Sequence, residues 1–161
     1  MAKTYRITFG VRLSNAIVTA LLCAGVKLRV PGGFGKMILL TVRGRKSGVP
    51  HTIPVVMGER SDQRWLVSPF GEVNWARNLR AAGEGVVTCG RHSEPISVVE
   101  LSALEAAPVL KQLLVGGAPS LVRSYFEVTP ASPLEDFERE AHRHPVFLVR
   151  HGAGSFGDGG G

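Results

Sequence analysis

Cysteine and long apolar runs are scarce in this sequence. Its 161 residues include two cysteines, Cys23 and Cys89, too few for a disulfide framework and without the paired spacing of a zinc site. The apolar stretch at residues 15–26 is shorter than the roughly 20 residues that a membrane-spanning helix needs, and no small-residue cleavage site follows it. We therefore expect a cytoplasmic protein with reduced cysteines and no cleaved signal peptide.

The sequence also lacks the short signatures of several enzyme classes. GRKSG at residues 44–48 does not have the glycine spacing of a P-loop, and GGFG at residues 32–35 precedes a strand pattern instead of opening a helix. No G-x-S-x-G segment occurs, so hydrolase chemistry has no support. His142, His144 and His151 have no cysteines or well-placed carboxylates nearby. We interpret them as solvated surface residues and predict no metal site.

Basic residues and turn-forming residues are abundant. The chain has 19 Lys and Arg against 13 Asp and Glu, a formal net charge of +6. This excess favours an anionic partner, which leaves open a phosphate ligand, a nucleic acid or a membrane surface. Twenty glycines and ten prolines predict many turns and short strands, and the length fits one domain.

Hydrophobic spacing predicts a mixed fold. Alternating apolar runs predict strands at residues 37–42, 52–58, 65–68, 86–89, 96–101 and 145–150, and helical spacing predicts helices at residues 8–27, 74–82, 103–115 and 132–143. Ser102 with Glu105, and Ser132 with Glu135, have the spacing of capping boxes, and Pro133 is expected at a first helical position. Because helices do not alternate with every strand, we predict an α+β fold built on an antiparallel sheet or small barrel.

Three regions differ in composition. Residues 1–30 contain an apolar helix, which we expect either to pack on the domain or to lie on a membrane surface through residues 8–27. Residues 31–151 carry the predicted strands. Residues 152–161 are rich in glycine and have too little apolar surface to fold, so we expect a disordered tail.

The most unusual segment is a basic stretch between two predicted strands. Arg43, Arg45, Lys46 and Ser47 occur around Gly44 and next to Gly48. A loop with glycines at both ends can turn its backbone N–H groups toward one point and bind an anion. A solvated basic turn that keeps a hairpin edge from aggregating is the alternative. The residue types alone leave both interpretations open.

Three ordered motifs carry a resemblance to a known family. LLTVRGRKSGVPHTIPVV at residues 39–56 is followed by WLVSPFG at residues 65–71 and by NWARNLRAAGEG at residues 74–85. Together they resemble the deazaflavin (F420)-dependent nitroreductase and quinone reductase family. The resemblance implies a split β-barrel of about six mainly antiparallel strands with flanking helices. It also implies coenzyme F420, a 5-deazaflavin with a phosphate and an acidic oligoglutamate tail.

The resemblance assigns roles to individual residues. It implies that Arg45, Lys46, Ser47 and Gly48 hold the phosphate and the tail, with Arg43 as a further cation. His51 stands where the family usually has an arginine. The remaining implied cofactor residues are Pro54 and Ser68 beside the deazaflavin ring, and Trp75 and Asn78 on the helix that lines the pocket. Tyr125 and Ser68 are the candidate catalytic residues, as sources of a proton.

The implied activity is hydride transfer from reduced F420 to an electron-poor acceptor such as a quinone, a nitroaromatic compound or an enone. The alternatives keep the barrel but bind FMN or haem, or carry F420 without catalysis. A basic nucleic-acid-binding barrel is an alternative of another class. It would need aromatic residues for base stacking, which residues 43–52 do not contain, so no nucleic acid is expected. The expected partner is a small-molecule acceptor, and the protein is expected to be a monomer or a homodimer.

Overall fold

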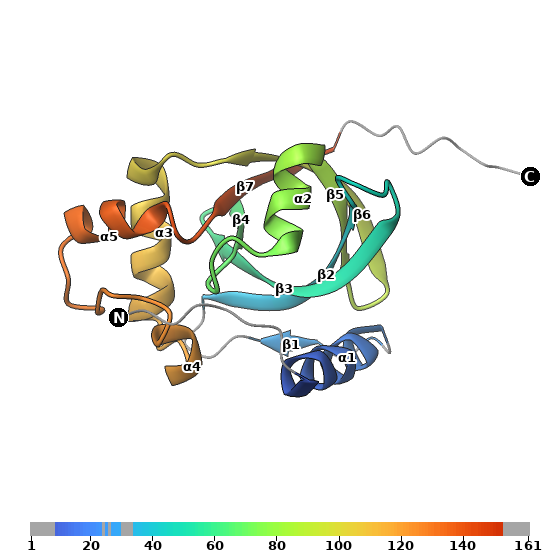
Figure 1. Cartoon of the computed structure of the whole chain (residues 1–161), viewed down its shortest axis with the longest axis horizontal. Coiled ribbons are helices and arrows are strands. Elements are labelled where there is room, and N and C mark those ends of the chain that lie inside the picture. The colour runs from blue at the N-terminus through green and yellow to red at the C-terminus, as the bar shows by residue number, and fades with distance from the viewer. Residues whose placement is uncertain (1–8, 24, 26, 30–33, 153–161) are drawn as a thin grey trace, which may run out of the picture.

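A closed antiparallel barrel forms the centre of the molecule (Figure 1). The computed structural model describes residues 9–23, 25, 27–29 and 34–152. The strand order around the barrel is β2-β3-β4-β7-β6-β5, and β5 pairs with β2 to close it. The strands are β2 (Gly35–Arg43), β3 (Pro50–Arg60), β4 (Gln63–Val67), β5 (Glu84–Cys89), β6 (His92–Glu100) and β7 (Val146–His151). The short strand β1 (Leu28–Arg29) pairs with β2 outside this ring.

Alternate strand positions fill the barrel interior. Ile38, Leu40 and Val42 of β2 are at most 2% exposed and pack with apolar residues of the other strands. Helix α2 (Asn74–Ala82) covers one end of the barrel, and its Leu79 is completely buried in the same cluster. The helix ends at Gly83, whose φ of +70° is the left-handed conformation that favours glycine. We call the buried cluster that contains Ile38, Leu40, Val42 and Leu79 the inner core.

The remaining helices lie outside the barrel. Helices α3 (Ala103–Val115) and α5 (Leu134–Ala141) pack against each other on one side, where Figure 1 shows them beyond β4 and β7. They form an outer core with Trp65, Val67 and Phe126, and the short helix α4 (Ser120–Arg123) lies next to it. Helix α1 (Phe9–Cys23) contacts β2 and β3 on another side. None of the described helices is long and apolar enough to cross a membrane.

The predicted fold class is confirmed, because the structure is an α+β barrel of six antiparallel strands with flanking helices. The helix at residues 103–115 and its capping box are also as predicted. The second capping box is wrong: α5 begins after Pro133 without a side-chain cap, and Ser132 Oγ instead accepts the N–H of Thr129 at 3.0 Å. The predicted tail lies outside the described residues apart from its first glycine, as do parts of the predicted helix at residues 8–27.

Replacing Ser102 with alanine should destabilise the protein by about 1 kcal/mol. The Ser102 hydroxyl accepts the Glu105 N–H at 3.3 Å, and the Glu105 carboxylate accepts the Ser102 N–H at 3.4 Å. The variant removes the acceptor of the Glu105 N–H and the 2.9 Å bond from the Ser102 hydroxyl to the Glu105 carboxylate, whereas the backbone N–H at position 102 keeps its partner. Urea denaturation measures the loss, and Ser124→Ala, a substitution outside any N-cap, is the control. An equal loss in both variants would contradict the capping role.

Glu140 and His144 form a buried polar pair beside the outer core. The prediction that His144 is at the surface is therefore wrong. His144 is 2% exposed and Glu140 is 5% exposed, and His144 Nε2 lies 3.1 Å from Glu140 Oε1. The Phe126 ring stacks on the imidazole with a centroid distance of 3.9 Å. Burial lowers the pKa of His144, opposed in part by the hydrogen bond to Glu140 and by the nearby Pro69 backbone.

The free energy of unfolding should therefore fall as the pH drops below the ordinary histidine pKa of 6.5. Below pH 6.5 the unfolded chain binds a proton at this histidine, whereas the folded chain does not. The stability that this histidine contributes is therefore complete above pH 6.5, and it is lost as the pH falls toward the lowered pKa of His144 in the folded state. One proton changes the stability by at most about 1.4 kcal/mol per pH unit. Urea denaturation from about pH 7.5 to about pH 5 measures this. His144→Gln should show a shallower pH dependence, and equal slopes would contradict the assignment.

Candidate active site

A cavity of about 500 Å³ lies between the β2–β3 hairpin and helix α2. This volume is within the range of small-molecule sites. Its lining comes from β2 and β3, from the turn between them (residues 44–49, the basic turn), from α2 and from the loop before α2. The lining residues are Val42, Gly44, Arg45, Lys46, Ser47, His51, Ile53, Pro54, Phe70, Val73, Asn74, Trp75 and Asn78.

Hydrogen bonds within the backbone shape the basic turn. The Gly44 N–H donates to the Val49 carbonyl at 2.9 Å, and the Gly48 N–H donates to the Gly44 carbonyl at 2.9 Å. Gly48 has a φ of +70°, which glycine adopts without strain. A Cβ at Gly44 would lie 2.8 Å from Ser47 Oγ and 3.2 Å from His51 Nε2. Glycine at position 44 therefore lets these two polar side chains approach the backbone.

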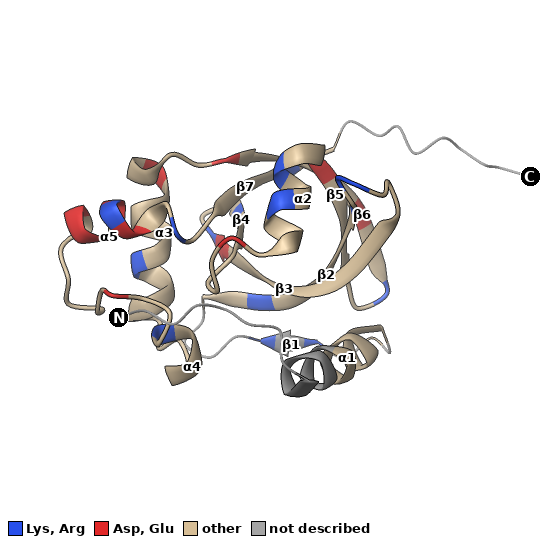
Figure 2. Ribbon diagram, viewed as in Figure 1, with Lys and Arg blue, Asp and Glu red and all other residues tan. Residues whose placement is uncertain are grey.

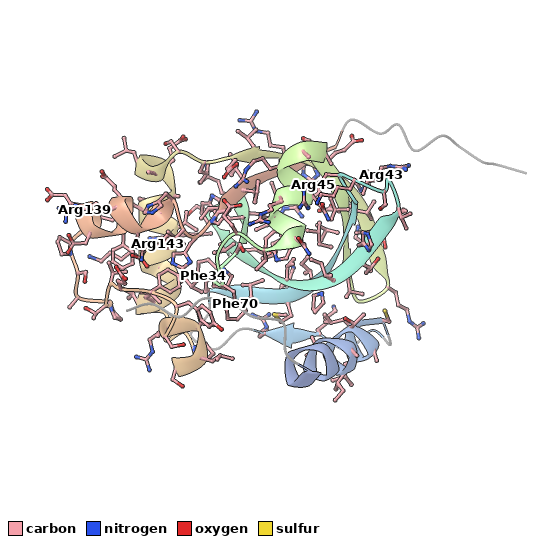
Figure 3. The ribbon with its side chains drawn as sticks, in the orientation of Figure 1. Phe34, Arg43, Arg45, Phe70, Arg139 and Arg143 are labelled. Carbon is pink, nitrogen blue, oxygen red and sulfur yellow. The ribbon has the colours of Figure 1, made fainter. Side chains whose placement is uncertain are left out.

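Asn78 of α2 fixes the basic turn to the helix. Its Oδ1 accepts the backbone N–H of Arg45 at 3.2 Å and the side-chain Nη1 of Arg45 at 2.8 Å. Asn78 is 7% exposed, so this oxygen is largely shielded from water. The remaining N–H donors of the guanidinium are left for a ligand. Figure 3 shows Arg45 beside α2, whereas Arg43 points away at the outer edge of the hairpin.

The two ends of the cavity differ in character. The basic turn forms one end, and none of the described lining residues is Asp or Glu. Figure 2 shows basic positions on this turn and on α2. Pro54, Phe70, Val73 and Trp75 form the other end. The three steps along β3 from His51 to Pro54 span about 10 Å, so the charged and apolar ends are well separated.

An ion-pair cluster fixes α2 over the barrel. Arg80 of α2 donates to Glu100 at 2.6 Å and to Glu72 at 2.7 Å. The hydrogen bond from Arg80 lowers the pKa of Glu72, and the bonds to Glu100 and Glu72 raise the pKa of Arg80. These groups are partly exposed, so their main role is to orient the helix that carries Trp75 and Asn78.

Most of the predicted cofactor residues come together around this cavity. Arg45, Lys46, Ser47, His51, Pro54, Trp75 and Asn78 line it. Among the described residues, Arg43, Gly48 and Ser68 do not line it. Arg43 is exposed and its Nη1 donates to the Gly48 carbonyl at 3.4 Å. Gly48 shapes the turn without forming part of the lining, and its predicted contact with the cofactor stays a prediction.

The two predicted catalytic residues do not line the cavity in the described structure. Ser68 is 1% exposed, and its Oγ donates to the Gly71 carbonyl at 2.6 Å. Tyr125 packs on the outer core, and its ring meets the Phe70 ring edge to face at a centroid distance of 5.0 Å. Tyr125 thus contacts a residue of the cavity wall. The catalytic roles of Ser68 and Tyr125 stay predictions.

Sequence reasoning missed several lining residues, which are Val42, Gly44, Ile53, Phe70, Val73 and Asn74. Asn74 and Trp75 stand at the start of α2, close to the predicted Asn78, so helical spacing could have included Asn74. Phe70 carries no such signal, because it lies in a loop between β4 and α2.

The chain matches one family model, described as F420H(2)-dependent quinone reductase, over residues 12–127. No curated protein matches it. Among solved structures it is similar to an F420-H2-dependent reductase (FDR-A), with 24% identity and a TM-score of 0.45 over 71% of this chain and 93% of that one. It is also similar to a pyridoxamine 5'-phosphate oxidase-related FMN-binding protein from Nostoc punctiforme, with 12% identity and a TM-score of 0.47 over 84% of this chain and 78% of that one.

The fold and the cavity define a split-barrel protein with a site suited to an elongated ligand that has one anionic and one apolar end. The family match extends over most of the chain, and the chain belongs to the F420H(2)-dependent quinone reductase family. It is therefore an oxidoreductase that uses coenzyme F420 and reduces a small-molecule acceptor, as the sequence motifs predicted.

Proposed function

We propose that the cavity binds F420H2 in one orientation, with its phosphate and acidic tail at the basic turn and its deazaflavin rings between Pro54 and Trp75. The division of the cavity into a cationic end and an apolar end carries this proposal. F420 has the same division, since a flat ring system is joined through a phosphate to carboxylates. Opposite charge at one end and apolar surface at the other allow only one orientation to satisfy both.

Three side chains of the basic turn offer different contacts to the anionic end. The Arg45 guanidinium, held by Asn78, presents planar N–H donors, and Lys46 presents a point charge. Ser47 Oγ accepts the Val49 N–H at 3.2 Å, which leaves its own O–H to donate to a phosphate. His51 adds a further donor in the same part of the lining.

When bound, F420H2 supplies the hydride, from C5 of the deazaflavin, to an electron-poor acceptor such as a quinone, a nitroaromatic compound or an enone. The chain's own part is to bind, to orient and to exclude water. Trp75 packs against the inner core, and its ring lies beside that of Phe147 at a centroid distance of 6.2 Å. A wall held in this way keeps the ring site in place.

Mixing the protein with F420H2 and menadione tests this function. We expect the cofactor to be oxidised at a rate proportional to protein concentration. The return of the absorbance of oxidised F420 monitors this reaction. Replacing menadione with a nitroaromatic compound or an enone ranks the acceptor classes. Tight binding without turnover of any acceptor would indicate a carrier, and absence of both binding and turnover would contradict the proposed function.

We further propose that α1 contacts an anionic membrane surface, which would suit an enzyme whose acceptor is a lipid-soluble quinone. Ile17 and Leu21 are 53% and 42% exposed, and their spacing places them on one face of the helix. Two basic residues lie near the segment that follows α1: Arg91 Cγ would lie 3.9 Å from a Cβ at Gly25, and Lys27 Cε would lie 3.5 Å from a Cβ at Gly90. An apolar helix face next to basic side chains is typical of interfacial helices.

Flotation with anionic liposomes tests the membrane contact. Replacing Ile17 and Leu21 with serine should reduce flotation, because both substitutions remove apolar area from α1. The matched control replaces Leu104 and Val115 of α3, which are 68% and 60% exposed, with serine. Equal flotation of the two variants would contradict the proposal.

We also propose that residues 31–151 form the cofactor-binding unit and that residues 1–30 are accessory to it. The cytoplasmic location and the choice between monomer and homodimer stay predictions. Sedimentation of the purified protein with and without F420 measures the oligomeric state.

A further inference from the structure

The loop between β4 and α2 carries Phe70 into the apolar end of the cavity, and residues 143–145 hold this loop. The Ser68 N–H donates to the Pro145 carbonyl at 2.9 Å. Gly71 has a φ of +100°, and a Cβ there would lie 3.4 Å from the Arg143 carbonyl oxygen. The backbone on both sides of Phe70 is thus packed against the segment that follows α5. Figure 3 shows Phe70 on the side of the barrel that faces α5.

The segment after α4 supports the other side of the Phe70 ring. The Tyr125 ring meets it edge to face, with an interplanar angle of 78°. The next residue, Phe126, is 7% exposed and stacks on His144 with an interplanar angle of 14°. The Glu127 N–H donates to Glu140 Oε1 at 3.0 Å. Three consecutive residues therefore connect the cavity wall to the buried pair of Glu140 and His144.

This buried pair is costly for stability alone. Both side chains are removed from water, and His144 Nδ1 has no hydrogen-bond partner within the described structure. Apolar side chains of similar volume would fill the same space without this desolvation cost. Hydrogen bonds fix relative positions in a way that apolar packing does not. Glu140 Oε1 accepts both the Glu127 N–H and the His144 Nε2–H, so it fixes the segment that contains Glu127 relative to the segment that contains His144.

We propose that Glu140 and His144 are positioning residues that hold Phe70 in the cavity wall, and that Phe70 determines which acceptors fit beside the deazaflavin rings. This inference rests on the proposed function, because it assigns the apolar end of the same cavity to the acceptor. Phe70 lies at the end remote from the basic turn, so its replacement should not affect the contacts of the acidic tail.

Charged and polar groups from other parts of the chain surround the buried pair of Glu140 and His144. Arg143 forms an ion pair with Glu127 at 3.1 Å on the exposed side, and the Pro69 backbone approaches His144 from the loop that carries Phe70. The connection between the pair and the loop is therefore direct on one side and passes through Phe126 and Tyr125 on the other. Both routes end at Phe70.

A double-mutant cycle in the full chain tests the proposal. Phe70→Ala and Glu140→Ala should each raise the KM for menadione about tenfold, the usual effect of reshaping an apolar pocket. The Kd for F420 should change much less than the KM for menadione, since the basic turn, Pro54 and Trp75 are untouched. The double variant should be no worse than Phe70→Ala, because Glu140 acts through Phe70. Glu140→Gln, which keeps an oxygen acceptor for the Glu127 N–H, should restore most of the wild-type KM.

Two controls separate positioning from general destabilisation. Ser102→Ala removes the N-cap of α3, outside the contacts that connect Glu140 to Phe70, and should leave the KM for menadione unchanged. Hydrogen exchange should become faster at residues 68–73 in Glu140→Ala but not in Glu140→Gln or Ser102→Ala. A raised KM in Ser102→Ala, additive effects in the double variant, or unchanged exchange in Glu140→Ala would overturn the positioning role.

A failure of the proposed function can be distinguished from a failure of the positioning role. A wild-type protein that neither binds F420 nor turns over menadione would contradict the function and the acceptor role of Phe70 with it. The exchange measurement needs no turnover, and in that case it still decides whether Glu140 and His144 hold the Phe70 loop.

Discussion

Replacing Lys46 with alanine should weaken F420 binding by roughly 1–3 kcal/mol, the usual worth of a hydrogen bond to a charged group. Lys46 lines the cationic end of the cavity, where no described lining residue is acidic. Arg45→Ala should have an effect at least as large, because Arg45 also loses its bond to Asn78 Oδ1. A fluorescence titration with F420 measures both dissociation constants.

Arg43→Ala is the matched control for this series. It removes the same charge from the same hairpin, but Arg43 does not line the cavity in the described structure, whereas Arg45 and Lys46 do. Its effect should be small and should vanish at high salt, because a charge outside the cavity acts on the ligand only through screened, long-range attraction. Equal losses for Arg43→Ala and Lys46→Ala would mean that net charge, and not the geometry of the basic turn, governs binding.

Replacing Phe147 with alanine should destabilise the protein by about 3–5 kcal/mol, because Phe147 is 1% exposed in the inner core. The same change should weaken F420 binding about tenfold, since a small displacement of a positioning group can cost that much. Trp75 lies against the Phe147 ring and would lose its support. Urea denaturation and the F420 titration measure the two effects.

Leu110→Ala is the control for Phe147→Ala. Leu110 is completely buried in the outer core, and its loss should cost about 2–5 kcal/mol without altering the Kd for F420. If the outer-core variant weakened F420 binding as much as Phe147→Ala does, Trp75 would have no special dependence on the barrel interior.

Local patterns in the sequence predicted the barrel and the basic end of the site. The alternation in β2 places Ile38, Leu40 and Val42 in the inner core, and the same two-residue period puts Arg43 on the outside. Arg43 is separated from Arg45 and Lys46 because the strand ends at Arg43 and the turn begins after it. The strand at residues 37–42 was predicted, but its alternation was not applied to the residue that follows.

The apolar end could not be predicted in the same way. Phe70 lies in a loop, and its position depends on contacts with residues more than 50 positions further along the chain, such as Tyr125 and Pro145. His144 was expected at the surface because the sequence shows no cysteine or well-placed carboxylate nearby. Its burial comes from stacking against Phe126, which is a tertiary contact, together with the i,i+4 contact to Glu140 on the preceding helix.

The measurement that tests the central claim most directly is a crystal structure of the protein with F420 bound. Density for the phosphate and the first carboxylate should lie beside Arg45, Lys46 and Ser47, and the deazaflavin rings should lie between Pro54 and Trp75. Density in another part of the molecule, or rings at the basic turn with the acidic tail beside Phe70, would contradict the account.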